Sequence, residues 1–431
     1  MISLRYNLIV LVQVFLNFIN SVFLIREFGV SPETDAYFIL LTVFSSIYLI
    51  QLMPIEQFMY FYNDAKLENR KFVEDFYFLG LFTSSLIGFL SLIVFVFGEK
   101  YLIKFFVYKM DSHRLELLIS YSKYYKYILL VMPINYIFSS TLIAESKIGY
   151  SYISNVLPPL FTFISLFFSF FVNIEITFVI KLTVLGYFFS FAIYVYILKH
   201  YLNYDFKFNA LHRYSFEFIK NSFMMRFGHN INNFGLPFFT NNFLSFFQTG
   251  YVSHFYYAQR IALALQNIMI GPSSKVLQSK ISSNVARKSF SLISYDIKKY
   301  FKFFSPFVLF ITVFVYFLIP SILGYISSGI SYSDTVSIQS MFAFMIFLNF
   351  IMFFESPFDM FLIAQKNSRI FMGVNFIFIL IYLTVFFTFL NKLGVYSVLL
   401  ALVFSQSVSA VIYFLTANRK INFLKIKSGI F

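Results

Sequence analysis

Arg226 and Arg260 stand out chemically, because each lies in a stretch long and apolar enough to cross a bilayer. An arginine at the centre of a membrane helix costs about 2.5 to 3.5 kcal/mol on insertion scales, so its side chain faces protein or water rather than lipid. A guanidinium donates planar, bidentate hydrogen bonds that match phosphate oxygens. The two arginines therefore predict a hydrated cavity that accepts an anion, most simply a phosphate or a diphosphate.

Polar side chains accompany these arginines at helical spacing. Tyr257, Arg260 and Asn267 recur at intervals that bring them to one face of a helix. The other polar positions are Asn17 in the first apolar stretch, and Asn230 and Asn233 beside Arg226. These residues predict a substrate path, but asparagines inside a membrane also hydrogen-bond helix to helix, and for them that alternative stays open.

Acidic residues are fewer in the apolar stretches. Glu355 and Asp359 are four residues apart on one helical face, a spacing that suits binding of a cation or transfer of a proton. Alternatively, they form ion pairs with Arg226 or Arg260 across helices. No set of residues has the spacing of a metal site or of a nucleotide-binding loop, so we expect no metal, no cofactor and no use of ATP.

Asp35 lies at the start of the second apolar stretch, where Pro32 and Glu33 precede it. Proline and acidic residues are favoured in the first turn of a helix, because the acids complement the positive end of the helix dipole. This pattern predicts a helix N-terminus close to Asp35. Stabilisation of that terminus alone would account for the acidic residues.

The composition requires these residues to be positioned by membrane helices. Of the 431 residues 59% are hydrophobic and 12% are charged, about half the charged fraction of a soluble domain. Apolar runs of about 20 to 25 residues recur, which is the length that an α-helix needs to cross a bilayer. We therefore expect an all-α membrane protein with about twelve spans. They cover residues 6–27, 36–60, 77–98, 117–142, 152–172, 177–198, 222–246, 251–274, 303–324, 338–363, 369–390 and 395–416.

The net charge of +14 is distributed unevenly along the chain. If the N-terminus is cytoplasmic, 22 Lys and Arg residues fall in the inner segments and six in the outer ones. This asymmetry predicts a multi-pass protein with both termini in the cytoplasm, and basic segments that meet anionic lipid rather than nucleic acid. The absence of cysteine excludes disulfides and thiolate metal sites.

The chain divides near its midpoint, where residues 199–220 form the longest polar stretch between spans. TDAYF at 34–38 opens the second span, and the similar SHFYY at 253–257 opens the corresponding span of the second half. We therefore expect two parallel six-helix lobes around a central cavity. The N-terminal lobe covers 1–200, a cytoplasmic linker covers 201–221, and the C-terminal lobe covers 222–431. Within the second lobe, the basic segment 275–302 is either a helix along the inner surface or an ordinary loop.

Residues 26–44 and 251–282 resemble the multidrug/oligosaccharidyl-lipid/polysaccharide (MOP) exporter superfamily, and most of all its Wzx-type O-antigen and exopolysaccharide flippases and its lipid II (MurJ) flippases. The matched positions are Arg26, Phe28, Gly29 and Thr34 to Phe38 in the first half, and Tyr257, Ala258, Arg260 and Ile261 in the second. The resemblance implies a cavity arginine at Arg260, a functional charged pair at Arg26 and Asp35, and a two-lobed transporter.

Two departures favour a Wzx-type substrate over lipid II. Residues 45–58 lack the basic cluster that lipid II flippases place there, and their two additional C-terminal helices have no counterpart. The resemblance implies a flippase of the bacterial cytoplasmic (inner) membrane, not an enzyme. It would carry a polyprenyl-diphosphate-linked oligosaccharide from the inner to the outer leaflet, driven by membrane potential or an ion gradient. Its partners would be this substrate, membrane lipids and other polysaccharide-assembly membrane proteins.

Other functions fit the same hydropathy. A lipid II flippase or a cation-coupled drug exporter would belong to the same superfamily, although a drug exporter would carry more acids than bases in its cavity. A membrane polysaccharide polymerase or ligase would usually have a long outer loop with catalytic residues. No such loop is visible in this sequence.

Overall fold

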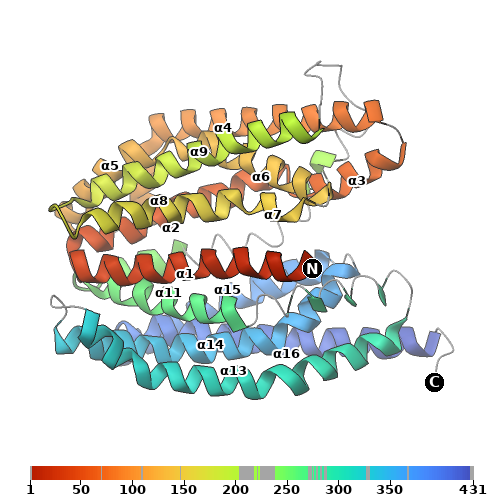
Figure 1. The fold of residues 1–431 in the computed structure, drawn as a ribbon. Helices are drawn as coiled ribbons and strands as arrows, with labels where there is room; N and C mark the ends of the chain where they lie inside the picture. Colours follow the sequence, from red (N-terminus) through yellow and green to blue (C-terminus); the bar gives the residue numbers. More distant parts are fainter. Residues whose placement is uncertain are drawn as a thin grey trace. The chain divides into compact units, whose positions relative to one another are not determined.

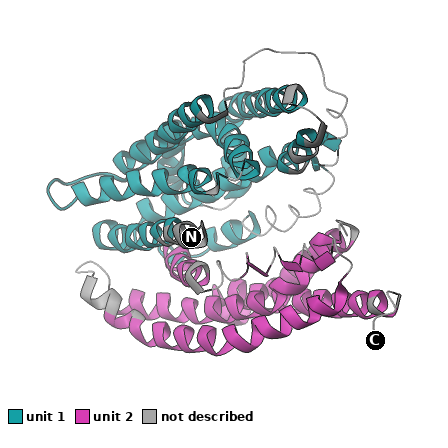
Figure 2. Ribbon diagram, turned by 45° about the vertical axis from the view of Figure 1, so that its right-hand side comes forward, with its two compact units in different colours: residues 1–252 teal, residues 253–431 magenta. Residues whose placement is uncertain are grey.

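The protein is described by a computed structural model, and all its regular elements in the described residues are helices (Figure 1). The described residues are 2–68, 70–107, 110–145, 147–202, 218–220, 222–223, 238–269, 274, 276–277, 280–281, 284–285, 289–326, 331–365 and 368–427. By their contacts, the residues form two compact units, 1–252 and 253–431 (Figure 2).

Unit 1 contains nine of the described helices. They are α1 (Ile2–Phe28), α2 (Pro32–Leu52), α3 (Phe58–Glu68), α4 (Arg70–Phe106), α5 (Ser112–Tyr125), α6 (Ile128–Ala144), α7 (Ile148–Ser151), α8 (Ile153–Phe168) and α9 (Ile176–Leu202). In this unit α6 packs against both α4 and α9, while α8 packs against α1 and α9.

Unit 2 contains a further set of helices. They are α11 (Tyr251–Met269), which begins two residues before the unit boundary, α13 (Phe290–Ile326), α14 (Tyr332–Ala364), α15 (Ser368–Leu393) and α16 (Tyr396–Lys427). The C-terminal helix α16 packs against α13, α14 and α15, and the core contains side chains from all four of these helices.

The expectation of an all-α membrane fold is confirmed. Among the described residues, seven helices are long and apolar enough to cross a membrane, or eight if the bent pair α5 and α6 forms one span. Large apolar side chains such as Phe97 on α4 and Phe317 on α13 are exposed, as expected of surfaces that face lipid. Helices satisfy all their backbone groups internally, which the hydrocarbon interior of a bilayer demands.

Several predicted spans have wrong boundaries. The span expected at 36–60 ends at Leu52, because a turn with Pro54 separates α2 from α3. The span expected at 117–142 is two helices, α5 and α6, that meet at a bend of 51°. The span expected at 303–324 begins at Phe290, while the one expected at 222–246 lies mostly outside the described residues.

The basic segment 275–302 is partly absorbed into α13. From Phe290 onward it is the first part of this long helix, with Ile293 and Ile297 buried and Lys298 exposed. It is therefore amphipathic, as expected, but this part is not a separate surface helix. The predicted linker 201–221 lies almost entirely outside the described residues, so the predicted lobe boundaries stay a prediction.

The helices repeat along the chain. Both ends of α13 are displaced from those of α4 by the same number of positions in the sequence. The same displacement relates the start of α14 to that of α5, the end of α14 to that of α6, and the start of α16 to that of α9. It agrees to within a single position with the displacement between the TDAYF and SHFYY motifs. The order and lengths of the helices thus agree with two similar halves.

Small residues allow the helices of unit 1 to approach closely. A Cβ atom on Gly88 of α4 would lie 2.9 Å from the backbone oxygen of Leu130 on α6. A Cβ atom on Gly186 of α9 would lie 2.8 Å from the Cα of Pro158 on α8. Close backbone approach at small residues is a main source of packing energy between membrane helices, since lipid tails are as apolar as the helices themselves.

We predict that Gly88→Ala destabilises the protein, although a helix interior favours alanine over glycine by about 1 kcal/mol. The added methyl group meets backbone rather than a movable side chain, and overpacking of this kind costs about 1 to 3 kcal/mol. Gly373→Ala is the matched control, because nothing lies within 4 Å of a Cβ atom built there. Thermal melting of the purified variants measures the difference, and equal melting temperatures would contradict the prediction.

Candidate functional site

A buried polar network occupies the end of unit 1 where α2 begins. Ser31 is the N-cap of α2, and its hydroxyl and the Thr34 side chain form a capping box with each other's backbone N–H. Pro32 occupies the first turn, as the sequence predicted. Gly29, which ends α1, adopts φ 58°, a left-handed conformation that glycine adopts without strain. This short connection fixes the position of Asp35.

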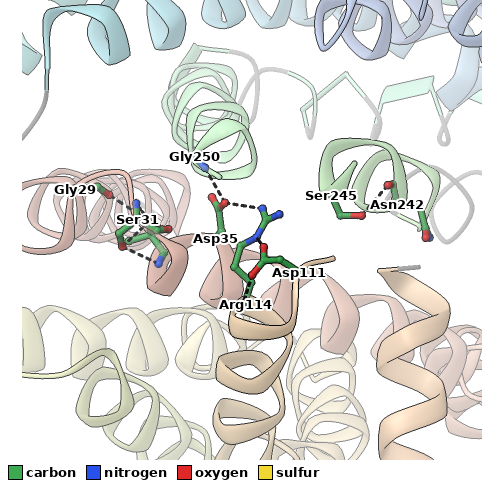
Figure 3. A network of polar contacts seen from close by, with 9 residues as sticks. Gly29, Ser31, Asp35, Asp111, Arg114, Asn242, Ser245 and Gly250 are labelled. Atoms are coloured by element: carbon green, nitrogen blue, oxygen red, sulfur yellow. Dashed lines mark hydrogen bonds and ion pairs between the residues drawn. The ribbon is translucent and has the colours of Figure 1, made fainter. Parts of the chain in front are cut away.

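Asp35 is completely buried and is neutralised by a residue far away in sequence. Its Oδ2 atom lies 3.1 Å from Nη1 of Arg114, the third residue of α5, whose exposed fraction is 4%. The backbone N–H of Gly250, just before α11, donates to the same oxygen at 2.9 Å. Figure 3 shows Asp35 between these two donors. One carboxylate therefore connects the starts of α2 and α5 with the chain at Gly250, all within unit 1.

Asp111 completes this network as the N-cap of α5. Its Oδ1 accepts a hydrogen bond from the Arg114 backbone N–H at 2.9 Å, and its Oδ2 pairs with the Arg114 Nε. Partial burial raises the pKa of Asp111, but hydrogen bonds and the positive charge of Arg114 outweigh this effect and hold the pKa below its ordinary value. Arg114 thus lies between two carboxylates and is held in one orientation.

The charged pair implied for Arg26 and Asp35 has a different geometry in the structure. Asp35 pairs with Arg114, whereas the guanidinium carbon of Arg26 lies 4.0 Å from the ring centroid of Phe170. Arg26 is exposed, and an arginine over an aromatic face at an exposed site forms a cation–π contact worth about 0.5 to 1 kcal/mol. The functional roles of Arg26 and Asp35 stay a prediction.

Helix α11 contains the predicted cavity arginine. Tyr257 is completely buried, Arg260 is half-buried, and Asn267 lies on the same helix. Two contacts within unit 2 hold α11 against α14: His254 Nε2 lies 2.9 Å from Asp334 Oδ1, and Asn349 Nδ2 donates to the Ala262 carbonyl at 2.9 Å. Contacts with α14 thus hold α11 both before and after Arg260 in the sequence.

The two acidic residues of α14 meet polar groups of α16. Gln406 donates a hydrogen bond to Glu355, and the phenol of Tyr413 is close enough to interact electrostatically with both Glu355 and Asp359. The role of both carboxylates in ion coupling, and the alternative in which they pair with Arg226 or Arg260, stay predictions.

The remaining predicted residues differ in how far the structure tests them. Asn17 on α1 is exposed, while Asn20 one turn later is buried and donates to the Pro159 carbonyl at 2.8 Å. Asn20 thus forms a hydrogen bond from one helix to another, as intramembrane asparagines often do. Three further predicted residues, Arg226, Asn230 and Asn233, lie outside the described residues.

Sequence reasoning missed Arg114, Gln406 and Tyr413. Arg114 is one of the six Lys and Arg residues assigned to outer segments, although Asp111 is a favoured N-cap residue that would have moved the start of this span. Its pairing with Asp35 spans 79 residues, and no local pattern reveals such a contact. Among the described residues, no group of three or more His, Cys, Asp or Glu side chains could hold a metal ion.

Comparisons with solved structures place this arrangement among known folds. The lipid II flippase MurJ in an inward closed conformation matches with a TM-score of 0.78 and 19% identity, over 99% of this chain and 90% of that chain. An inward-facing multidrug resistance MATE family transporter of the MOP superfamily matches with a TM-score of 0.76 and 14% identity, over 96% of each chain. A MOP superfamily transporter from Pyrococcus furiosus matches with a TM-score of 0.71 and 14% identity, over 98% of this chain and 96% of that one.

This chain has the fold of these transporters. The likeness extends over almost the whole chain, and it confirms the expected all-α membrane fold in two lobes. The neighbours are transporters and flippases rather than enzymes. No protein-family model and no curated protein sequence matches the chain.

We predict that Asp35→Ala destabilises the protein by about 1 to 3 kcal/mol, because it leaves the buried Arg114 guanidinium with Asp111 as its remaining carboxylate and removes the acceptor of the Gly250 N–H. Asp111→Ala is the control, since its side chain is 45% exposed and its loss removes an N-cap worth about 1 kcal/mol. The double variant Asp35→Leu with Arg114→Met should recover much of the loss, because it removes both buried charges. Thermal melting of all three variants tests this, and equal effects of the two alanine variants would contradict it.

Proposed function

We propose that the protein is a flippase that moves a polyprenyl-diphosphate-linked oligosaccharide, an O-antigen or exopolysaccharide repeat unit, across the bacterial cytoplasmic membrane. The observation that carries this proposal is Arg260, a half-buried guanidinium on α11 of a chain with a transporter fold. A cation held there attracts an anionic head group, and a diphosphate offers the oxygens that a guanidinium binds best. The similarity to a lipid II flippase over almost the full chain supports a lipid-linked substrate.

In this mechanism the diphosphate enters from the inner leaflet and binds at Arg260, with Arg226 as a second cation. The polyprenyl tail stays in the bilayer throughout, so its transfer free energy does not oppose transport. Alternating access then exposes the head group to the outside. Hydroxyl groups of the sugar would be bound by Tyr257, Asn17, Asn230, Asn233 and Asn267, whose side chains donate and accept hydrogen bonds. Arg26 and Asp35 would complete the site.

The membrane potential drives transport in the required direction. An anion that moves outward against an inside-negative potential releases about 2.3 kcal/mol per charge per 100 mV. Two charges on a diphosphate would therefore supply on the order of 5 kcal/mol without ATP. Both termini would lie in the cytoplasm, where the positive-inside rule puts most of the Lys and Arg residues.

Glu355 and Asp359 would add an ion gradient to this driving force. Two carboxylates one turn apart within a membrane helix are costly to keep charged, so a proton or a cation stabilises them. Gln406 and Tyr413 supply neutral polar groups that suit such a site. The same carboxylates favour a second candidate, a cation-coupled drug exporter, which would bind cationic substrates instead.

We predict that Arg260→Ala abolishes translocation of lipid-linked oligosaccharide in proteoliposomes under an imposed potential, while Arg260→Lys keeps part of it. Lysine preserves the charge but lacks the bidentate geometry. The control is Arg419→Ala, at an exposed arginine near the end of α16, which should transport like the wild type. Unchanged transport in Arg260→Ala would contradict the proposed role. Export of cationic dyes without oligosaccharide transport would favour the drug exporter.

We also predict that Glu355→Gln and Asp359→Asn weaken the dependence of transport on an ion gradient, because each removes a group that binds a proton or cation. Transport driven by potential alone should persist. Glu116→Gln, at an exposed position on α5, is the control for loss of a carboxylate. Wild-type transport that does not change with the proton or sodium gradient would remove the coupling role from both residues.

A further inference from the structure

Unit 1 carries an apolar groove that the proposed transport path does not use. It has a volume of about 240 Å³ and is bounded by one face each of α4, α6 and α9. Its lining residues recur at helical spacing: Tyr77, Leu81 and Ser85 on α4, Ile134 and Phe138 on α6, and Phe191, Val195, Leu198 and Lys199 on α9. Helix α6 packs against both α4 and α9, so it forms the floor of the groove.

The groove has the length of one bilayer leaflet. Its residues extend eight positions along α4 and eight along α9, which at 1.5 Å per residue is about 12 Å, close to half of the roughly 30 Å hydrocarbon thickness. Ser85 and Val195 are exposed along its edge, so the groove is open on one side. In a membrane-spanning unit, an open apolar groove of this length admits a hydrocarbon chain from the surrounding leaflet.

The charge at one end of the groove indicates which lipid it holds. Lys199 carries the sole charge among the described residues that line it, and no carboxylate within that part of the chain forms an ion pair with it. Lys199 lies in the last turn of α9, at the end that the positive-inside rule assigns to the cytoplasm. A lysine at this depth extends its amine to the head-group layer while its stem covers apolar surface.

We propose that this groove is a binding site for an anionic phospholipid of the inner leaflet, with one acyl chain in the groove and the phosphodiester at Lys199. A single ammonium matches the single negative charge of a phosphodiester. A diphosphate would call for several cations or a bidentate guanidinium, so the groove suits a membrane phospholipid better than the transported substrate. Basic pockets between membrane helices on the cytoplasmic side are known to bind anionic head groups.

The chain has no tryptophan, so one introduced tryptophan reports on the groove alone. The reporter is Phe191→Trp, and Val195→Trp serves if repacking of the Phe191 ring, 5.8 Å from that of Phe138, prevents folding. The purified full chain is reconstituted with brominated phosphatidylglycerol or brominated phosphatidylcholine, because bromine on an acyl chain quenches an indole in contact with it. We expect about fivefold preferential quenching by phosphatidylglycerol, the factor that one lysine near an anionic head group supplies.

Two matched variants decide the outcome. Lys199→Gln, added to the reporter, should abolish the preference for phosphatidylglycerol. Phe97→Trp, on a side chain of α4 that is 84% exposed and not among the groove residues, should show no preference. Equal quenching by both lipids at the groove, a preference that survives Lys199→Gln, or the same preference at position 97 would overturn the proposal.

A third lipid separates this site from transport. Polyprenyl diphosphate is added to the brominated phosphatidylglycerol vesicles, and relief of quenching at low amounts would identify the groove as a site for the substrate tail instead of a phospholipid. The fluorescence needs no translocation, so failure of the transport assay leaves this measurement intact.

Discussion

A carboxylate with no exposure to solvent can stay charged only beside a fixed positive group, and this constraint organises one end of unit 1. Asp35 satisfies this constraint by pairing with Arg114 and by accepting a hydrogen bond from the backbone N–H of Gly250. Because the carboxylate lies in the first turn of α2, its partners tie α5 and the chain just before α11 to the same point. Asp111 holds Arg114 from the other side, so neither helix start can move without exposing a buried charge.

The apolar pattern of the sequence predicted the helices because lipid leaves the backbone no other way to satisfy its hydrogen bonds. It also predicted the N-terminus of α2, since Pro32 and the following acids act locally. The bend between α5 and α6 was not predictable, because Lys126 and Tyr127 are not helix breakers. The bend depends on tertiary packing rather than on local propensity.

The site was predictable to a smaller extent than the fold. Arg260 is visible in the sequence because a guanidinium within an apolar run violates the pattern around it. Arg114 escaped notice because it lies at the polar start of a span, where a charge is expected. The contact of Glu355 with Gln406 joins residues that are 51 apart, and neither residue alone indicates the other. Long-range pairs become apparent only when the packing of the helices is known.

Helices α4 and α13 are each 37 residues long, which at 1.5 Å per residue is about 55 Å, against roughly 30 Å of hydrocarbon. Each helix therefore extends well beyond the apolar layer, and α4, which unlike α13 has no internal proline, does so as a rod continuous with its span. A tilt of about 5° along such a rod displaces one end relative to the other by about 5 Å. Motions too small to disturb packing inside the bilayer would thus become displacements of a full helical turn at the membrane surface.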